Sequence, residues 1–194
     1  MLKKIVAIGP ESTGKSTLCE QLAARYRTSW VPEFAREYLL RHGPSYTYDD
    51  LARIARGQIA LEDEYALSVS NNADFAPYLS QDLEEKLLFV DTDMYVMKVW
   101  SEFVFDRCES FILDQIVQRK YDLYLLCNVD LPWVRDELRE YPDLESRERL
   151  YRIYKDILVN QDVPWIDIHG SYDERLDRAV AGIGRHVLRP LGAG

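Results

Sequence analysis

The chain has 194 residues, 47% of them hydrophobic and 29% charged, so it is long enough to bury one hydrophobic core. Its net charge of −9 disfavours nucleic acid as the main partner, because a phosphate backbone would be repelled. The three cysteines form no Cys-x-x-Cys pair, and no apolar run approaches the ~18 residues of a membrane helix. We therefore expect a cytoplasmic protein that neither binds nucleic acid nor enters a membrane; the composition leaves a homo-oligomer open.

Strand and helix patterns alternate along the chain. Short apolar runs predict five strands, at residues 3–9, 29–32, 86–90, 122–127 and 164–168. Helical spacing and composition predict helices from residue 15, over 33–41 and 48–70, and around 96–103, 111–119, 150–158 and 176–187. Because the strands are continuously apolar, they are typical of a buried parallel sheet. We expect a single-domain α/β fold, a three-layer sandwich with a mostly parallel five-stranded sheet.

A phosphate-binding loop lies between the first strand and the first helix. Its sequence, GPESTGKS, fits the pattern G-x-x-x-x-G-K-[ST] in the strand-to-helix context that this pattern requires. Backbone N–H groups of such a loop and the helix dipole bind phosphate, Lys15 would reach the β- and γ-phosphates, and Ser16 would ligate Mg²⁺. We expect this P-loop to bind a nucleoside triphosphate through Gly9, Glu11, Ser12, Thr13, Gly14, Lys15, Ser16 and Thr17.

Carboxylates follow two of the other strands. Asp91 ends a strand that we expect beside the phosphate-loop strand, so it is the candidate second metal ligand after Ser16. Glu33 ends a different strand, at the edge where parallel sheets bind ligands, and could accept the proton of an attacking hydroxyl. The alternative for Glu33 is an intrahelical ion pair with Arg36. Asp93 is either a substrate ligand or a residue that stabilises a helix N-terminus.

Other residues are candidates for an acceptor pocket or a lid. Arg36, Gln58 and Trp100 could contact the acceptor, although a lone glutamine is more often a surface residue and Trp100 fits a core stripe. Residues 132–149 resemble the lid of a small-molecule kinase. We expect one or two of its arginines to bind phosphate, with a solvated helix face as the alternative for the rest; they are Arg135, Arg139, Arg147 and Arg149.

Four segments together resemble the NadR-type ribosylnicotinamide (nicotinamide riboside) kinase family. They are GPESTGKSTL, VPEFAREYL, FVDTDMYVMKVWSEF and NVDLPWVRDELRE, and the resemblance runs from residue 1 to about residue 187. It implies a kinase that uses ATP and Mg²⁺ to phosphorylate the 5′-hydroxyl of nicotinamide riboside. It also implies that Gly14, Lys15, Ser16 and Thr17 hold ATP and Mg²⁺, that Asp91 is the metal carboxylate, and that Arg139 is a lid cation.

One position departs from the family pattern. Some members carry an aromatic residue before the glutamate of the second motif, where this chain has Pro32, so Phe34, Tyr38 or Trp100 would have to stack on the base. Two alternatives therefore stay open beside a nicotinamide riboside kinase. One is a kinase of another nucleoside or small metabolite, and the other is a regulatory ATPase switch that docks a protein partner through the acidic segment 71–85.

Overall fold

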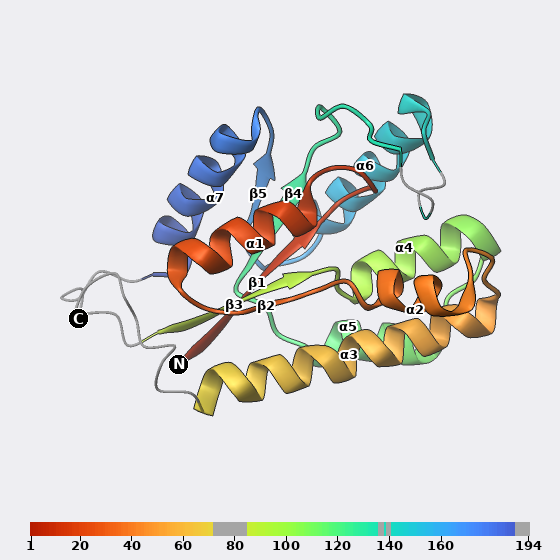
Figure 1. Ribbon diagram of the computed structural model, residues 1–194, viewed down its shortest axis with the longest axis horizontal. Helices are drawn as coiled ribbons and strands as arrows, with labels where there is room; N and C mark the ends of the chain where they lie inside the picture. The colour runs from red at the N-terminus through yellow and green to blue at the C-terminus, as the bar shows by residue number, and fades with distance from the viewer. Residues whose placement is uncertain (72–84, 136–137, 139–140, 189–194) are drawn as a thin grey trace.

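The computed structural model describes residues 1–71, 85–135, 138 and 141–188. Within these residues five strands form one sheet, in the order β2-β3-β1-β4-β5, and every neighbouring pair is parallel (Figure 1). The strands are β1 (Leu2–Ile8), β2 (Trp30–Val31), β3 (Lys86–Asp91), β4 (Leu123–Cys127) and β5 (Trp165–Ile168). The predicted parallel five-stranded sheet is confirmed, and each strand end lies within about one residue of its predicted place.

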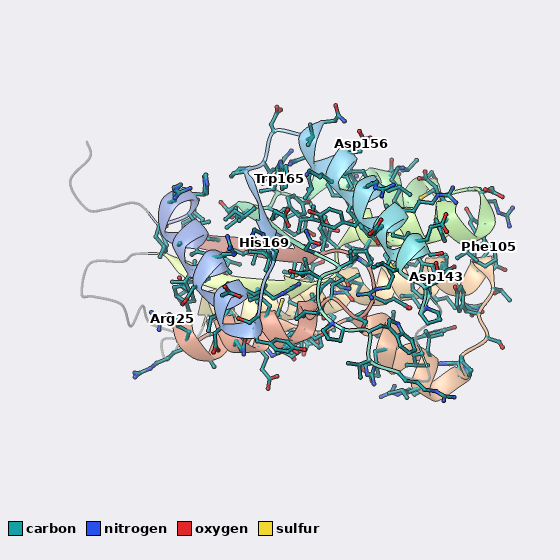
Figure 2. The ribbon with its side chains drawn as sticks, turned by 90° about the horizontal axis from the view of Figure 1, so that it is seen from above. Arg25, Phe105, Asp143, Asp156, Trp165 and His169 are labelled. Atoms are coloured by element: carbon teal, nitrogen blue, oxygen red, sulfur yellow. The ribbon has the colours of Figure 1, made fainter. Side chains whose placement is uncertain are left out.

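The helices occupy the predicted stretches between the strands. In the described residues they are α1 (Lys15–Tyr26), α2 (Phe34–His42), α3 (Tyr48–Asn71), α4 (Met94–Phe105), α5 (Ser110–Gln118), α6 (Leu144–Val159) and α7 (Tyr172–His186). In Figure 2, Asp143 and Asp156 mark the beginning and the later turns of α6, Trp165 marks the start of β5, and His169 marks the first residue after that strand.

Alternate residues of β1 face two different layers of helices. Ile5 and Ala7 are buried in a core that α1 and α7 complete on one face of the sheet. Val6 and Ile8 are buried in a second core on the other face, to which α3, α4 and α6 contribute. This two-sided burial is the reason that the strand reads as continuously apolar, and it confirms the predicted three-layer fold (Figure 1).

A third core joins α2, α3, α4 and α5, which lie below and to the right of the sheet in Figure 1. Phe34, at the start of α2, lies over Gly57 of α3, where an added Cβ would come within 2.1 Å of the phenyl ring. Gly57 therefore permits the close approach of these two helices. The contact fixes the N-terminal end of α2, and with it Glu33, against the rest of the protein.

Three further expectations do not concern the core. In the described part of the chain, no helix combines the length and the apolar character needed to cross a lipid bilayer. Residues 72–84 lie outside the described residues, so docking through the acidic segment 71–85 stays a prediction. The assignment of residues 1–194 to a single domain also stays a prediction.

Candidate active site

The candidate residues meet at the C-terminal edge of the sheet. The phosphate loop follows β1, Glu33 follows β2, and Asp91 is the last residue of β3. β3 pairs directly with β1, and the register places Asp91 opposite Ala7, two residues before the loop begins at Gly9. The parallel topology therefore brings together three segments that lie far apart in the sequence.

The phosphate loop depends on two glycines with positive φ. Gly9 has φ 141°, and a Cβ there would lie 2.6 Å from the carbonyl oxygen of Cys127. Gly14 precedes α1 with φ 77°, and an added Cβ would come within 3.0 Å of the Leu131 side chain. Because a residue with a side chain would be strained at both positions, these glycines determine how the loop curls.

Lys15, Ser16 and the fully buried Asp91 form a polar group beside the loop. The Lys15 ammonium donates to the carbonyl oxygens of Gly9 and Pro10 at 3.1 and 2.9 Å, and the Ser16 hydroxyl donates to Asp91 Oδ2 at 2.5 Å. Burial raises the pKa of Asp91, while the charge of Lys15 and the Ser16 hydrogen bond oppose this shift. A hydroxyl beside a carboxylate is the oxygen donor set that Mg²⁺ prefers, so these residues fit the implied metal.

Glu33 is a partly buried carboxylate close to this group. The Thr92 hydroxyl donates weakly to Glu33 Oε1, at 3.5 Å. Burial raises the pKa of Glu33 and the negative charge of Asp91 raises it further, while Lys15 and Arg36 act in the opposite direction. A carboxylate that holds its proton more tightly than usual is a stronger base, which suits the acceptance of a proton from an alcohol.

One cavity of about 360 Å³ joins the phosphate loop to an aromatic wall. Glu33, Arg36 and Trp100, three of the predicted acceptor residues, line it. The aromatic residues of the wall are Trp30, Tyr46, Trp100, Phe103, Tyr141 and Tyr154. Trp100 Nε1 donates to the Tyr46 hydroxyl at 2.7 Å, and the two rings meet almost perpendicularly, with centroids 4.9 Å apart. Trp100 thus supplies an aromatic surface that Pro32 does not.

Four predicted acceptor residues do not line the cavity. The ring of Phe34 packs over Gly57 instead. Tyr38 donates to Asp50 Oδ1 at 2.7 Å, and its ring stacks on His42 with centroids 4.2 Å apart. Both side chains are used to pack α2 against its neighbours. Gln58 and Asp93 are the other two, and their hydrogen bonds show what they do.

The buried side chain of Gln58 links the ends of two strands through hydrogen bonds. Its Oε1 accepts from Phe34 N at 2.7 Å, and its Nε2 donates to the carbonyl oxygens of Pro32 and Asp91 at 3.4 and 3.3 Å. Gln58 thus positions the segments that carry Glu33 and Asp91.

Asp93 is also buried. It caps α4 by accepting hydrogen bonds from Tyr95 N and Val96 N, which is the helix-stabilising role that the sequence left open.

The predicted lid segment touches the phosphate loop, although its candidate cation Arg139 lies outside the described residues. Tyr141 N donates to Glu11 Oε1 at 2.6 Å, and Val134 N donates to Ser12 Oγ at 3.0 Å. Arg147, which is 3% exposed, donates to the Ser12 carbonyl oxygen at 3.4 Å. Ser12 has φ 57°, so these contacts hold a non-glycine residue in a strained conformation.

Comparisons with known proteins agree with this fold. The family model described as AAA domain matches residues 4–175, so the chain belongs to this family of P-loop proteins. The chain is 27% identical over 180 residues to the trifunctional NAD biosynthesis/regulator protein NadR of Salmonella typhimurium, and 26% identical over 184 residues to that of Escherichia coli. Each alignment covers 92% of this chain but only 41% of the relative.

Solved structures of NadR and of a nucleoside kinase share the fold. A crystal structure of NadR in complex with NR has a TM-score of 0.74 at 21% identity and covers 98% of this chain and 52% of that one. Deoxyadenosine kinase from M. mycoides with bound dATP has a TM-score of 0.60 at 10% identity, covering 94% of this chain and 99% of that one. The chain is therefore a P-loop domain related to NadR with a fold that it shares with nucleoside kinases, and the resemblance drawn from its motifs is confirmed.

Proposed function

We propose that this chain is an ATP- and Mg²⁺-dependent kinase that phosphorylates the 5′-hydroxyl of nicotinamide riboside. The observation that carries the proposal is a cavity whose lining includes the phosphate loop, several aromatic side chains and Glu33. Phosphoryl transfer needs the donor phosphate and the acceptor hydroxyl side by side, and such a cavity holds both. The relationship to NadR, of which a structure in complex with NR is known, supports the choice of acceptor.

The donor side would be held by the phosphate loop. Its backbone N–H groups and Lys15 bind the phosphates and stabilise the charge that develops between them. Ser16 and Asp91 would hold Mg²⁺, which neutralises phosphate charge when it is bound. In the structure the Ser16 hydroxyl lies against Asp91, so both oxygen donors stand together.

The acceptor side would use Glu33 and the aromatic wall. Glu33 would accept the proton of the 5′-hydroxyl as it attacks, and Arg36, which also lines the cavity, would help to fix the ribose or phosphate end. The pyridinium ring of nicotinamide riboside is positively charged. Acidic Glu33 and aromatic faces such as that of Trp100 favour a cationic ring over a neutral base.

Acceptor-dependent turnover tests this proposal. With Mg·ATP, the purified protein should release one ADP for each nicotinamide riboside consumed and form nicotinamide mononucleotide. A matched control is nicotinamide mononucleotide itself, which keeps the ring but has no free 5′-hydroxyl and should release no ADP. Slow ADP release at a rate that does not depend on the acceptor would instead indicate a regulatory ATPase. ADP release only with a different alcohol would indicate a kinase of another substrate.

A further inference from the structure

A buried arginine of α7 contacts three of the loops that follow the strands. Arg175 is 2% exposed. Its Nη1 donates to the Thr13 carbonyl oxygen at 2.9 Å, its Nη2 to the Asn128 carbonyl oxygen at 3.0 Å, and its Nε to the Gly170 carbonyl oxygen at 2.9 Å. These oxygens belong to the loops after β1, β4 and β5. His169, labelled in Figure 2, marks the third of these loops.

An ion pair fixes the guanidinium in this position. Arg175 Nη2 also contacts Asp130 Oδ1, and Asp130 Oδ2 accepts from the Gly170 backbone N–H at 2.6 Å. The Asp130 side chain is 38% exposed, so only the arginine end of the pair is shut off from water. Because the guanidinium is planar and its donors point in fixed directions, one side chain can hold four acceptors at once.

The contact with Thr13 determines the direction of a peptide group in the phosphate loop. The chain has no cis peptide in the described residues, so each carbonyl points away from the N–H of the same peptide unit. When Arg175 draws the Thr13 carbonyl toward α7, the N–H of Gly14 is turned the opposite way, and Gly14 lines the cavity. An anion site of this kind depends on such inward N–H groups.

We propose that Arg175 is a positioning residue for triphosphate binding: its guanidinium fork, anchored by Asp130, holds the phosphate loop in its anion-binding shape. The inference rests on the proposed function, because it assumes that the loop binds a triphosphate. Arg175 does not line the cavity, so it acts through the Thr13–Gly14 peptide and not by touching the ligand. This role requires the planar guanidinium with its fixed donor directions, and not only a positive charge.

Binding of the non-hydrolysable analogue Mg·AMP-PNP, measured by calorimetry without acceptor, tests the inference. Arg175→Gln should raise the Kd about tenfold or more, the size of effect that losing a charged hydrogen bond produces. Arg175→Lys should also raise it, because an ammonium keeps the charge but not the fork. In turnover, the KM for ATP should rise while the KM for nicotinamide riboside stays unchanged.

The matched control is Arg119→Gln. Arg119 is another largely buried arginine, whose guanidinium pairs with Glu62 and Asp63, and none of these residues lines the cavity. This variant should lose thermal stability but bind AMP-PNP as the wild type does. If Arg175→Gln is too unstable to fold, Asp130→Ala, at a more exposed site, replaces it and should also weaken AMP-PNP binding.

Three results would overturn the inference: wild-type affinity in Arg175→Lys, in a folded Arg175→Gln, or in Asp130→Ala where that variant replaces it. Wild-type protein that does not bind AMP-PNP would overturn both this inference and the proposed function. Wild-type protein that binds AMP-PNP and shows the predicted losses in the variants, yet phosphorylates no nucleoside, would support the inference and refute the proposed function alone.

Discussion

Replacing Glu33 by glutamine separates catalysis from stability. The amide keeps the shape of the side chain but cannot accept the proton of the acceptor hydroxyl, so we expect kcat to fall by about 10²–10⁴ with little change in ATP affinity. The hydrogen bond that the Thr92 hydroxyl donates to Glu33 is weak, at 3.5 Å. Weakening it by removing the charge should therefore change the free energy of unfolding little.

The stability of the same variant should change in the opposite direction. Because burial raises the pKa of Glu33, the folded chain keeps the proton to a higher pH than the unfolded chain does. Stability therefore falls as the pH rises from the ordinary pKa of 4.5 through the raised one. Above that interval, Glu33→Gln should be more stable than the wild type. The gain is at most about 1.4 kcal/mol for each pH unit between the unfolded and folded pKa values, and it is smaller where water reaches the carboxylate.

Steady-state kinetics and thermal unfolding across pH measure both effects. The wild-type kcat/KM should rise with pH through the raised pKa of Glu33, and this acidic limb should be missing in the variant. Glu37→Gln is the control, because Glu37 lies in the first turn of the helix that follows Glu33 but is exposed and pairs with Arg41. Glu33→Gln that keeps more than about a tenth of the wild-type kcat would refute the assignment, as would a change in Mg²⁺ dependence alone.

Three further predictions concern other residues at this edge of the sheet. Lys15→Ala should abolish phosphoryl transfer and leave the melting temperature close to that of the wild type, whereas Lys98→Ala, on the surface of α4, should leave both unchanged; unchanged turnover in folded Lys15→Ala would contradict the phosphate site. Asp91→Asn should raise the Mg²⁺ concentration needed for half-maximal rate, and an unaltered Mg²⁺ titration would remove Asp91 from the metal site. Burial raises the pKa of Asp93 to about 7 from 3.8, so the folded wild type loses stability as the pH rises through this interval. Asp93→Asn should therefore gain stability relative to the wild type between pH 4 and pH 8, by about 4 kcal/mol at most, as urea unfolding at several pH values would show; equal pH dependence in both proteins would contradict this.

The sequence was informative where a local pattern has one physical cause. Buried parallel strands must be apolar on both faces, so β3 and β4, which are buried along almost their whole length, could be recognised from composition. The phosphate loop needs glycine at two positive-φ positions and places Lys15 and Ser16 at the start of a helix, which makes its spacing specific. Asp91 followed from its place at the end of β3, because parallel strands end at one edge of the sheet.

The aromatic wall could not be predicted in the same way. Helical spacing shows that Trp100 and Phe103 share a face of α4 with core residues, but not that this face continues from the core into a cavity. Tyr46 lies in a short loop with no pattern of its own, and its hydrogen bond with Trp100 joins residues 54 positions apart. Such long-range pairs leave no periodic signal in the sequence.

Polar residues near a motif were the hardest to interpret. Gln58 resembles a ligand-binding amide in the sequence, yet its hydrogen bonds reach backbone atoms 24 to 33 residues away and tie strand ends together. For Arg175 the sequence suggests too little rather than too much. An arginine in an amphipathic helix is expected at the surface, yet this one donates a hydrogen bond to the phosphate loop at Thr13. Whether a side chain touches the ligand or supports the residues that do is decided by the tertiary structure.

The preference for a cationic acceptor tests the central claim most directly. The kcat/KM for nicotinamide riboside should be compared with those for uridine, cytidine and adenosine at fixed Mg·ATP. Coulomb attraction by Glu33 and cation–π contact with the aromatic wall together favour the pyridinium by about 1–2 kcal/mol, so its kcat/KM should be higher by about fivefold to thirtyfold. A neutral nucleoside that matches or exceeds nicotinamide riboside, or a failure of all four to react, would contradict the account.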